Sequence, residues 1–218
     1  MKALFLAPHG DDAHIAAAGT MVRLLESRAE VYVATFSNAV ESLPKGFPPE
    51  SVDREFRAAS KALAIPEDHL MFEHHAVRRF PEKRQEILDT IHRWRMEFAP
   101  DWVFVPSTAD LHQDHAVIAT EATRAFRRSS SVYGFDMPWN VVGPARLDLF
   151  IELSEAHLRK KQAAVALYKS QQGKANACST PEYAENLARI RGNQINAPYA
   201  EAFEVIREVR RVGRGLLE

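Results

Sequence analysis

The sequence predicts an α/β protein built around a mostly parallel sheet, and three observations carry this prediction. Short apolar runs alternate with longer segments of helical periodicity up to about residue 136. The connections between these segments are short, as expected for repeated strand–helix–strand units. The run WVFVP at residues 102–106 is apolar throughout, which is typical of a parallel strand covered by helices on both faces.

The expected elements follow one another in a regular order. Five short apolar runs are expected to be strands, at residues 2–7, 30–36, 69–73, 102–106 and 131–136. Helical periodicity predicts helices at residues 14–28, around 56–63, at 81–98 and at 115–127. This alternation predicts a Rossmann-like three-layer sandwich, with helices on both faces of the sheet.

The last third of the chain has a looser pattern. We expect a strand at residues 147–153 and helices at 154–169 and 181–192, whereas residues 200–209 fit either a strand or a helix. No linker, low-complexity tract or internal repeat stands out. We therefore expect one domain over residues 1–218.

The composition is that of an ordinary globular protein, with 46% hydrophobic and 26% charged residues. The formal net charge of −1 gives no electrostatic reason to expect nucleic acid or an anionic membrane as a partner. A lone cysteine, Cys178, excludes a disulfide framework and suits a reducing compartment. The N-terminal apolar run is too short for a signal peptide, and no run approaches the roughly 20 apolar residues of a membrane span. We expect a cytoplasmic protein.

Two polar clusters directly follow two of the expected strands. PHGDDAH occupies residues 8–14 after the first strand, and STADLHQDH occupies residues 107–115 after the fourth. In the common strand order 3-2-1-4, the first and fourth strands are neighbours, and a crevice opens between them at their carboxyl ends. We therefore expect the two clusters to face each other at the carboxyl ends of strands 1 and 4.

The residue types in these clusters predict a catalytic zinc site. Two imidazoles and one carboxylate, with one position left open, form a ligand set used by catalytic zinc. His9 and Asp12 can converge from one side of a tight turn, and His115 would supply the third ligand. Another divalent first-row metal also suits such donors. An Asp after a strand is often only a helix N-cap, so the joint pattern carries the prediction.

The remaining polar residues suggest hydrolysis. The adjacent Asp11 and Asp12 repel each other unless a cation lies near them, and Asp11 would take a proton from the attacking water. His112 is placed to stabilise a developing oxyanion, preferably as the imidazolium, or to protonate a leaving amine. Asp114 is a natural partner for a metal-binding histidine, because such a carboxylate fixes the tautomer.

These residues resemble a known family. PHGDDAH and HQDH are similar to the paired motifs, commonly H-P-D-D and H-x-D-H, of the LmbE-like or PIG-L family of zinc-dependent N-deacetylases. The segments DREFRAASKALAI, RKKQAAVALYKSQQ and ARIRGNQINAPYAEAF resemble further parts of these proteins in the same order. The resemblance implies a Rossmann-like fold, zinc, and hydrolysis of the acetamide of an amino sugar, such as N-acetylglucosamine, or of a sugar conjugate.

Matched residue by residue, the resemblance implies the same site. It makes His9, Asp12 and His115 the zinc ligands, Asp11 the general base and His112 the group that stabilises the oxyanion.

The motif also departs from the family pattern. Gly10 stands where the family commonly has proline, which is expected to loosen the turn. Ala13 and His14 occupy positions where an acidic residue is often found. We expect His14 to face solvent at the first turn of its helix.

Substrate contacts are expected from loops at the same edge of the sheet. Asn38 and Asn140 could bind sugar hydroxyls, and Trp139 could stack on a sugar face. Arg54 is the nearest match to an arginine that related deacetylases use near the substrate. The alternatives are that Asn38 is a turn residue, Arg54 a solvated helix residue and Trp139 part of an interface in a homo-oligomer.

The expected activity is metal-dependent N-deacetylation of a small N-acetylated sugar or conjugate. Two alternatives stay open: a zinc hydrolase of another amide or ester, and a non-catalytic metal- or sugar-binding relative. A dinucleotide-dependent oxidoreductase is disfavoured because the first turn offers one glycine and two carboxylates, which would repel a pyrophosphate. The sequence also lacks the G-x-S-x-G motif of a serine hydrolase.

Overall fold

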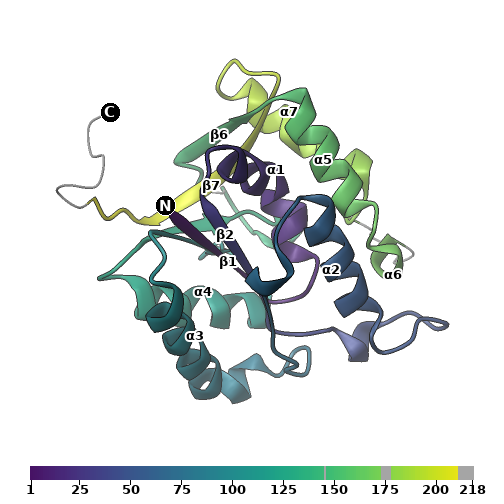
Figure 1. Ribbon diagram of the computed structural model, residues 1–218, viewed down its shortest axis with the longest axis vertical. Coiled ribbons are helices and arrows are strands. Elements are labelled where there is room, and N and C mark those ends of the chain that lie inside the picture. Colours follow the sequence, from purple (N-terminus) through teal and green to yellow (C-terminus); the bar gives the residue numbers. More distant parts are fainter. Residues whose placement is uncertain (145, 173–177, 211–218) are drawn as a thin grey trace.

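A seven-stranded sheet forms the centre of the protein (Figure 1) in a computed structural model that describes residues 1–144, 146–172 and 178–210. The strands lie in the order β3-β2-β1-β4-β5-β7-β6, which confirms the neighbouring position of β1 and β4. Their bounds are β1 Lys2–Ala7, β2 Glu30–Thr35, β3 Leu70–Phe72, β4 Trp102–Pro106, β5 Ser131–Phe135, β6 Leu149–Leu153 and β7 Tyr199–Arg207.

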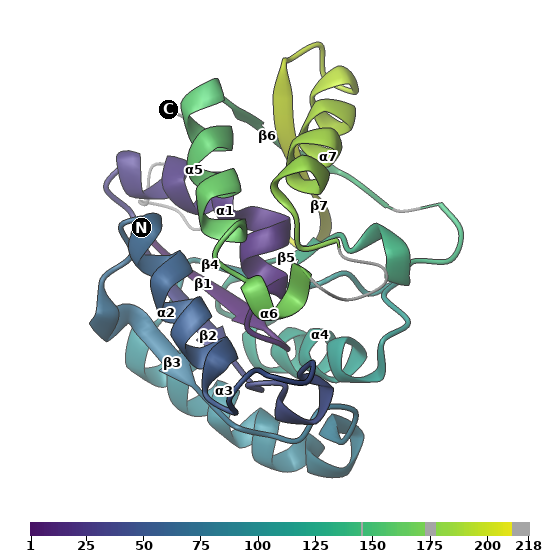
Figure 2. The same cartoon turned by 90° about the vertical axis from the view of Figure 1, so that its right-hand side faces the viewer.

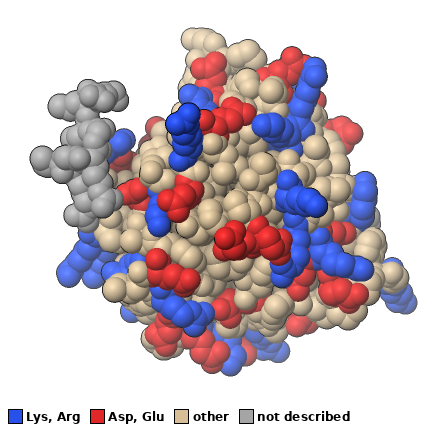
Figure 3. All heavy atoms as spheres, viewed as in Figure 1, with Lys and Arg blue, Asp and Glu red and all other residues tan. Residues whose placement is uncertain are grey.

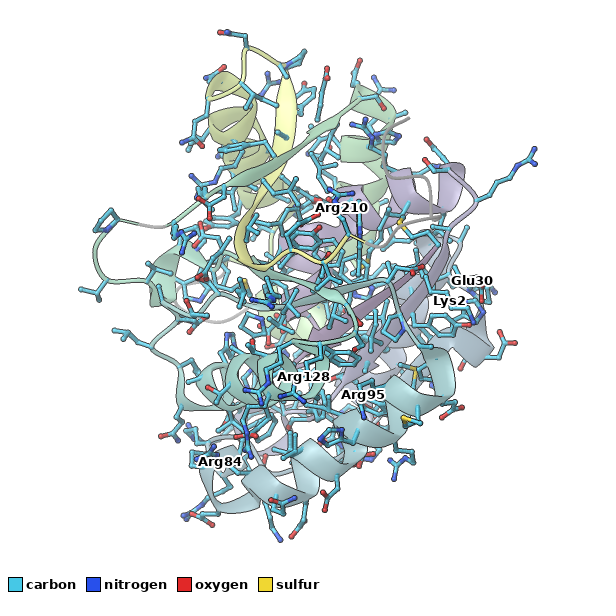
Figure 4. All side chains as sticks on the ribbon, turned by 90° about the vertical axis from the view of Figure 1, so that its left-hand side faces the viewer. Lys2, Glu30, Arg84, Arg95, Arg128 and Arg210 are labelled. Atoms are coloured by element: carbon cyan, nitrogen blue, oxygen red, sulfur yellow. The ribbon has the colours of Figure 1, made fainter. Side chains whose placement is uncertain are left out.

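The first five strands are parallel to one another, and only β7 runs antiparallel to its neighbours β5 and β6. The mostly parallel sheet is therefore confirmed. At its amino edge, Lys2 of β1 is in register with Glu30 of β2, and Nζ lies 3.5 Å from Oε2 (Figure 4). The carboxyl ends of the parallel strands meet at the opposite edge.

Helices cover both faces of this sheet (Figure 2). On one face, α1 and α2 contribute Ala17, Met21 and Phe56 to a core that includes small and aromatic side chains, and on the other α3 and α4 contribute Ile91 and Ile118. The helices are α1 Asp12–Glu26, α2 Ser51–Ala62, α3 Arg84–Phe98, α4 Gln113–Phe126, α5 Glu155–Val165, α6 Lys169–Gln172 and α7 Pro181–Asn193. The three-layer sandwich expected from the sequence is present.

The ambiguous segment 200–209 lies largely in a strand, β7, and the tertiary structure explains why. This strand is inserted between β5 and β6, so both of its edges are paired: Phe203 is opposite Phe135 on one side and Leu149 on the other. The helix expected at 154–169 instead ends at Val165 and is followed by the short α6.

Among the described residues, no helix combines the length and the apolar character needed to cross a bilayer. On the face seen in Figure 3, Lys and Arg side chains are interspersed with Asp and Glu. This mixture agrees with the formal net charge of −1.

Candidate active site

The two polar clusters come together at the carboxyl edge of the sheet. β1 ends at Ala7 and β4 at Pro106, and the two strands are parallel neighbours, with Phe5 opposite Phe104. The clusters that follow them therefore emerge side by side. The first continues directly into α1, which begins at Asp12, and the second into α4, which His112 caps by accepting the amide hydrogen of Asp114.

Three side-chain atoms from these clusters form a compact triangle. Nδ1 of His9 lies 3.1 Å from Oδ2 of Asp12, Nε2 of His115 lies 3.3 Å from the same oxygen, and the two nitrogens are 3.4 Å apart. A tetrahedral zinc with bonds of about 2.0–2.1 Å separates its ligand atoms by about 3.3–3.4 Å. The spacing of the three atoms therefore fits a single zinc ion.

Two further carboxylates hold the imidazoles in the orientation that this fit requires. Nε2 of His9 lies 3.1 Å from Oδ2 of Asp114, and Nδ1 of His115 lies 2.7 Å from Oδ2 of Asp110. Because a carboxylate accepts hydrogen bonds, these nitrogens carry ring hydrogens, and when each ring is neutral its other nitrogen presents a lone pair to the triangle. Asp114 is itself held by the backbone N–H of Arg78 at 2.6 Å.

A third imidazole, that of His112, lies beside the triangle. One nitrogen each of His9, His112 and His115 fall within 4.8 Å of one another, so these three histidines form an alternative donor set. The backbone N–H of Asp114 donates to Nδ1 of His112 at 3.2 Å, so the ring hydrogen of the neutral form is on Nε2. That tautomer suits His112 as a hydrogen-bond donor, and the atoms of the set with Asp12 lie within 3.4 Å of one another.

The charges of the cluster stabilise one another. Burial alone would lower the pKa of His9 and of His115. The neighbouring carboxylates, Asp12 above all, have the larger combined effect and raise these pKa values to about 9 and about 10. Burial would likewise raise the pKa of Asp12, yet His115 and His9 hold it well below its usual range. A carboxylate that stays ionised beside two imidazoles attracts cations, and a bound metal would replace the imidazole protons.

His112 differs from the other two histidines. Burial is the largest cause that lowers the pKa of His112, and the charges of the neighbouring His115 and His9 lower it further. Its Nδ1 also accepts a hydrogen, which an imidazolium cannot do. Both observations favour a neutral His112 over the expected imidazolium.

Asp11 lies next to this cluster and is oriented from another part of the chain. It precedes α1 without capping it through its side chain. Its Oδ2 accepts a hydrogen bond of 2.8 Å from Oγ of Ser179, which lies just before α7. Asp11 and Ser179 both line a cavity of about 220 Å³ that also contains His9, Asp12, His112 and His115.

The predicted substrate residues divide into two pairs. Trp139 and Asn140, in the turn after β5, line the cavity; the Trp139 ring lies 5.4 Å from that of Tyr183, and Nδ2 of Asn140 lies 3.3 Å from Oδ2 of Asp110. Asn38 is half-buried and is not among the residues that line the cavity. Arg54 is also outside the lining, with its side chain 63% exposed and 3.8 Å from Glu50.

The structure corrects one expectation about the first motif. His14 does not face solvent: its side chain is fully buried, burial lowers its pKa to about 3, and its Nδ1 lies 2.6 Å from the hydroxyl of Tyr168. At Gly10 the packing leaves no room for a larger residue. Val52 packs so closely against Gly10 that a Cβ there would lie 2.6 Å from its Cγ1.

Sequence reasoning missed several residues of the site. Asp110 was part of the second cluster but received no role, although it anchors His115. Asp110 precedes His115 by five residues, and this spacing predicts a contact between them only when the loop conformation is known. Gln171, Cys178 and Ser179 also line the cavity. Gln171 belongs to a segment that resembles the family, but no local pattern connects Cys178 and Ser179 to the motifs.

A doubly wound sheet with a two-histidine, one-carboxylate cluster at its switch point defines the class: a Rossmann-like protein with a candidate metal site. The chain belongs to the PIG-L family, because the family model matches residues 4–126. The family is described as GlcNAc-PI de-N-acetylase. This membership confirms the resemblance seen in the two motifs. No curated protein matches the chain in a sequence comparison.

Solved structures share the fold over most of their length. The conserved protein TT1542 from Thermus thermophilus is 24% identical, with a TM-score of 0.75 and coverage of 97% of both chains. The N,N'-diacetylchitobiose deacetylase from Pyrococcus horikoshii is 18% identical, with a TM-score of 0.77 over 94% of this chain and 83% of that one. GalB, a 4-carboxy-2-hydroxymuconate hydratase from Pseudomonas putida, is 20% identical, with a TM-score of 0.74 over 96% of this chain and 98% of that one. The fold therefore does not choose the reaction by itself.

Proposed function

We propose that the protein is a zinc-dependent hydrolase that removes the N-acetyl group of an amino sugar or sugar conjugate, releasing acetate and a free amine. The observation that carries the proposal is the triangle formed by His9, Asp12 and His115, with Asp11 and His112 beside it in one cavity. Membership of a family described as a de-N-acetylase supports the reaction.

His9, Asp12 and His115 would hold the zinc ion. When bound, such an ion acts as a Lewis acid on the acetyl carbonyl and makes water more acidic, to a pKa near 7 in known zinc enzymes. Asp114 and Asp110 keep the two imidazoles in the tautomers that leave His9 Nδ1 and His115 Nε2 free to bind. The buried carboxylates thus prepare the donor set before any ligand arrives.

Asp11 is the proposed general base. It lines the cavity next to the donor set, and the hydroxyl of Ser179 holds its Oδ2 in place. Its carboxylate would accept one proton from the attacking water and later deliver it to the departing amine nitrogen. Transfer of this proton to nitrogen gives the free amine and acetic acid, because hydrolysis of the amide adds one water across the broken C–N bond. The acetic acid then loses its own proton to solvent and leaves as acetate.

His112 is the proposed oxyanion donor. The backbone of Asp114 occupies its Nδ1, and the neutral ring then carries hydrogen on Nε2. A fixed donor of this kind stabilises negative charge on the carbonyl oxygen as the tetrahedral transition state develops. A neutral His112 does not supply the proton of the leaving amine, so that role belongs to Asp11.

The substrate class is supported by the cavity wall and by a structural relative. Trp139 offers an aromatic surface of the kind that packs against a sugar ring, and Asn140 adds an amide at the same turn. The similar structure from Pyrococcus horikoshii is a deacetylase of an N-acetylated disaccharide. Asn38 and Arg54 lie outside the cavity lining and are not part of this proposal.

The test is acetate release from a panel of N-acetylated amino sugars and their conjugates. Zinc-loaded wild type would be compared with Asp11→Asn, and Asp89→Asn on the exposed face of α3 serves as a matched control. We expect Asp11→Asn to keep its zinc and to lose about 10³-fold or more in kcat, as a lost general base and its charge imply. The control should match the wild type.

Two outcomes would refute this mechanism. Nearly full turnover by Asp11→Asn would exclude its role as the base. Zinc bound by the wild type at one equivalent, without acetate release from any member of the panel, would favour a binding protein or a hydrolase of another amide or ester.

A further inference from the structure

A chain of buried hydrogen bonds reaches the backbone of the first motif from two helices and a loop. Oγ of Ser60 on α2 lies 3.3 Å from Nε2 of His14 on α1, and Nδ1 of His14 lies 2.6 Å from the hydroxyl of Tyr168. Tyr168, in the connection between α5 and α6, donates in turn to the carbonyl oxygen of Gly10 at 2.7 Å. Ser60, His14 and Tyr168 are fully buried.

The directions of these hydrogen bonds follow from counting hydrogens. The carbonyl oxygen of Gly10 can only accept, so the single hydroxyl hydrogen of Tyr168 points at it. A hydroxyl hydrogen turned toward His14 would leave two oxygen lone pairs facing each other at 2.7 Å. Nδ1 of His14 must therefore carry the ring hydrogen and donate to Tyr168, and Nε2 accepts from the hydroxyl of Ser60.

The end of this chain is one bond away from the proposed base. The carbonyl of Gly10 and the N–H of Asp11 belong to the same planar peptide group. A hydrogen bond to that carbonyl consequently sets the orientation of the peptide plane that leads into Asp11. Val52 packs closely against Gly10, and Ser179 holds the carboxylate of Asp11, so the base is restrained at its backbone and at its side chain.

We propose that Tyr168 and His14 are positioning residues for Asp11, acting through the Gly10 carbonyl. This inference rests on the proposed function for its catalytic consequence. It also accounts together for two of the departures from the family motif, Gly10 and His14. A glycine lacks the restraint that a proline ring puts on φ, and the buried chain restrains the turn from outside instead.

The central experiment compares two buried tyrosines. Tyr168→Phe removes the hydroxyl that binds Gly10. Tyr133→Phe removes the hydroxyl of another buried tyrosine, which donates to Glu208 at 2.7 Å beyond the end of β7, and is the matched control. We expect Tyr168→Phe to lower kcat by about 10- to 100-fold, the size associated with a misplaced catalytic group. KM and bound zinc should stay unchanged, and the control should keep the kcat of the wild type.

A second pair of variants tests whether the residues act as one chain. His14→Leu should lower kcat as Tyr168→Phe does, and the double variant should be little worse than either single variant, because both break the same connection. His14→Asn retains a side-chain nitrogen donor near the place of Nδ1 and should restore part of the loss. A Tyr168→Phe enzyme with the kcat of the control would overturn the proposal, as would a loss of kcat that only follows a loss of zinc.

One measurement is independent of activity. The ¹⁵N chemical shifts of the His14 ring should show hydrogen on Nδ1 in the wild type, the less common tautomer in solution. A ring with hydrogen on Nε2 alone would overturn the chain even if the enzyme is active. If the wild type releases no acetate, the proposed function fails, whereas the ring tautomer still decides whether the chain exists.

Discussion

Among the described residues, two clusters of buried charge are built in opposite ways. In the first, Lys161 of α5 and Glu201 of β7 form an ion pair of 2.6 Å, and both side chains are almost fully buried. The second is the cluster of His9, Asp12 and His115 at the carboxyl edge of the sheet. Both carry the high cost of removing charge from water, but the donor atoms of the second line the cavity of the candidate active site.

The Lys161–Glu201 pair uses its hydrogen-bonding capacity internally. Glu201 accepts from the lysine and also from the backbone N–H groups of Gly19 and Thr20, at 3.0 and 2.6 Å, and Lys161 donates to the carbonyl of Ala16 at 3.2 Å. These contacts join α1, α5 and β7. The pair is thus directed inward, and its expected role is to hold those elements in one arrangement.

In the second cluster, the outer carboxylates orient the imidazoles so that their other nitrogens converge on the carboxylate of Asp12. Asp114 and Asp110 bind the far nitrogens of His9 and His115, and the near nitrogens converge on Asp12. Once the imidazoles lose their second protons, three lone-pair donors share a space that fits a cation. The comparison teaches that burial and charge alone do not identify a site; what matters is whether the donors are used by the protein or left for a ligand.

The largest effect is expected when a residue of the converging cluster is removed. His115→Ala deletes one of the three proposed ligands, so metal and turnover should be lost together. Zinc content measured by mass spectrometry, beside acetate release, checks this outcome. Full zinc binding by His115→Ala would assign the metal to another donor set and would break the contrast between the two clusters.

An intermediate effect on a different property is expected at the inward pair. Lys161→Met leaves the carboxylate of Glu201 buried without its cation, which should destabilise the protein by about 3–5 kcal/mol. Urea unfolding measures the loss, and the folded variant should keep its zinc and kcat. Removing both charges in Lys161→Met with Glu201→Gln should recover much of the stability. A selective loss of turnover without a loss of stability would contradict the structural role.

The smallest effect is expected from a residue that only orients a ligand. Asp110→Asn keeps the size of the side chain but weakens the anchor of His115 Nδ1, so zinc affinity should fall by about 10- to 100-fold. Competition with a zinc chelator gives the affinity, and Asp148→Asn, just before β6 and away from the cavity, is a matched control. Affinity equal to that of the wild type would show that Asp110 does not tune the site.

The sequence was most informative where chemistry is concentrated in short motifs. His9, Asp12 and His115 were predicted to lie together because imidazoles and carboxylates cluster after two strands, and the order of those strands follows from a general property of doubly wound sheets. The structure brings the three side chains together. β4 was predicted at its observed bounds because a strand buried on both faces is apolar throughout. The family followed from the same two motifs.

The tertiary structure decided what depends on contacts between distant segments. The segment that forms β7 fits two periodicities, and pairing with β5 and β6 selects the strand. His14 looked like a solvent-facing residue of a first helical turn, but Ser60 and Tyr168 enclose it. A local sequence pattern gives the types and spacing of residues, and these determine which chemical groups are available to a site. The hydrogen-bond partner of each polar group is set by packing between distant segments, such as those of His14 and Tyr168, which are 154 positions apart. These partners determine the tautomers and orientations on which the proposed reaction depends.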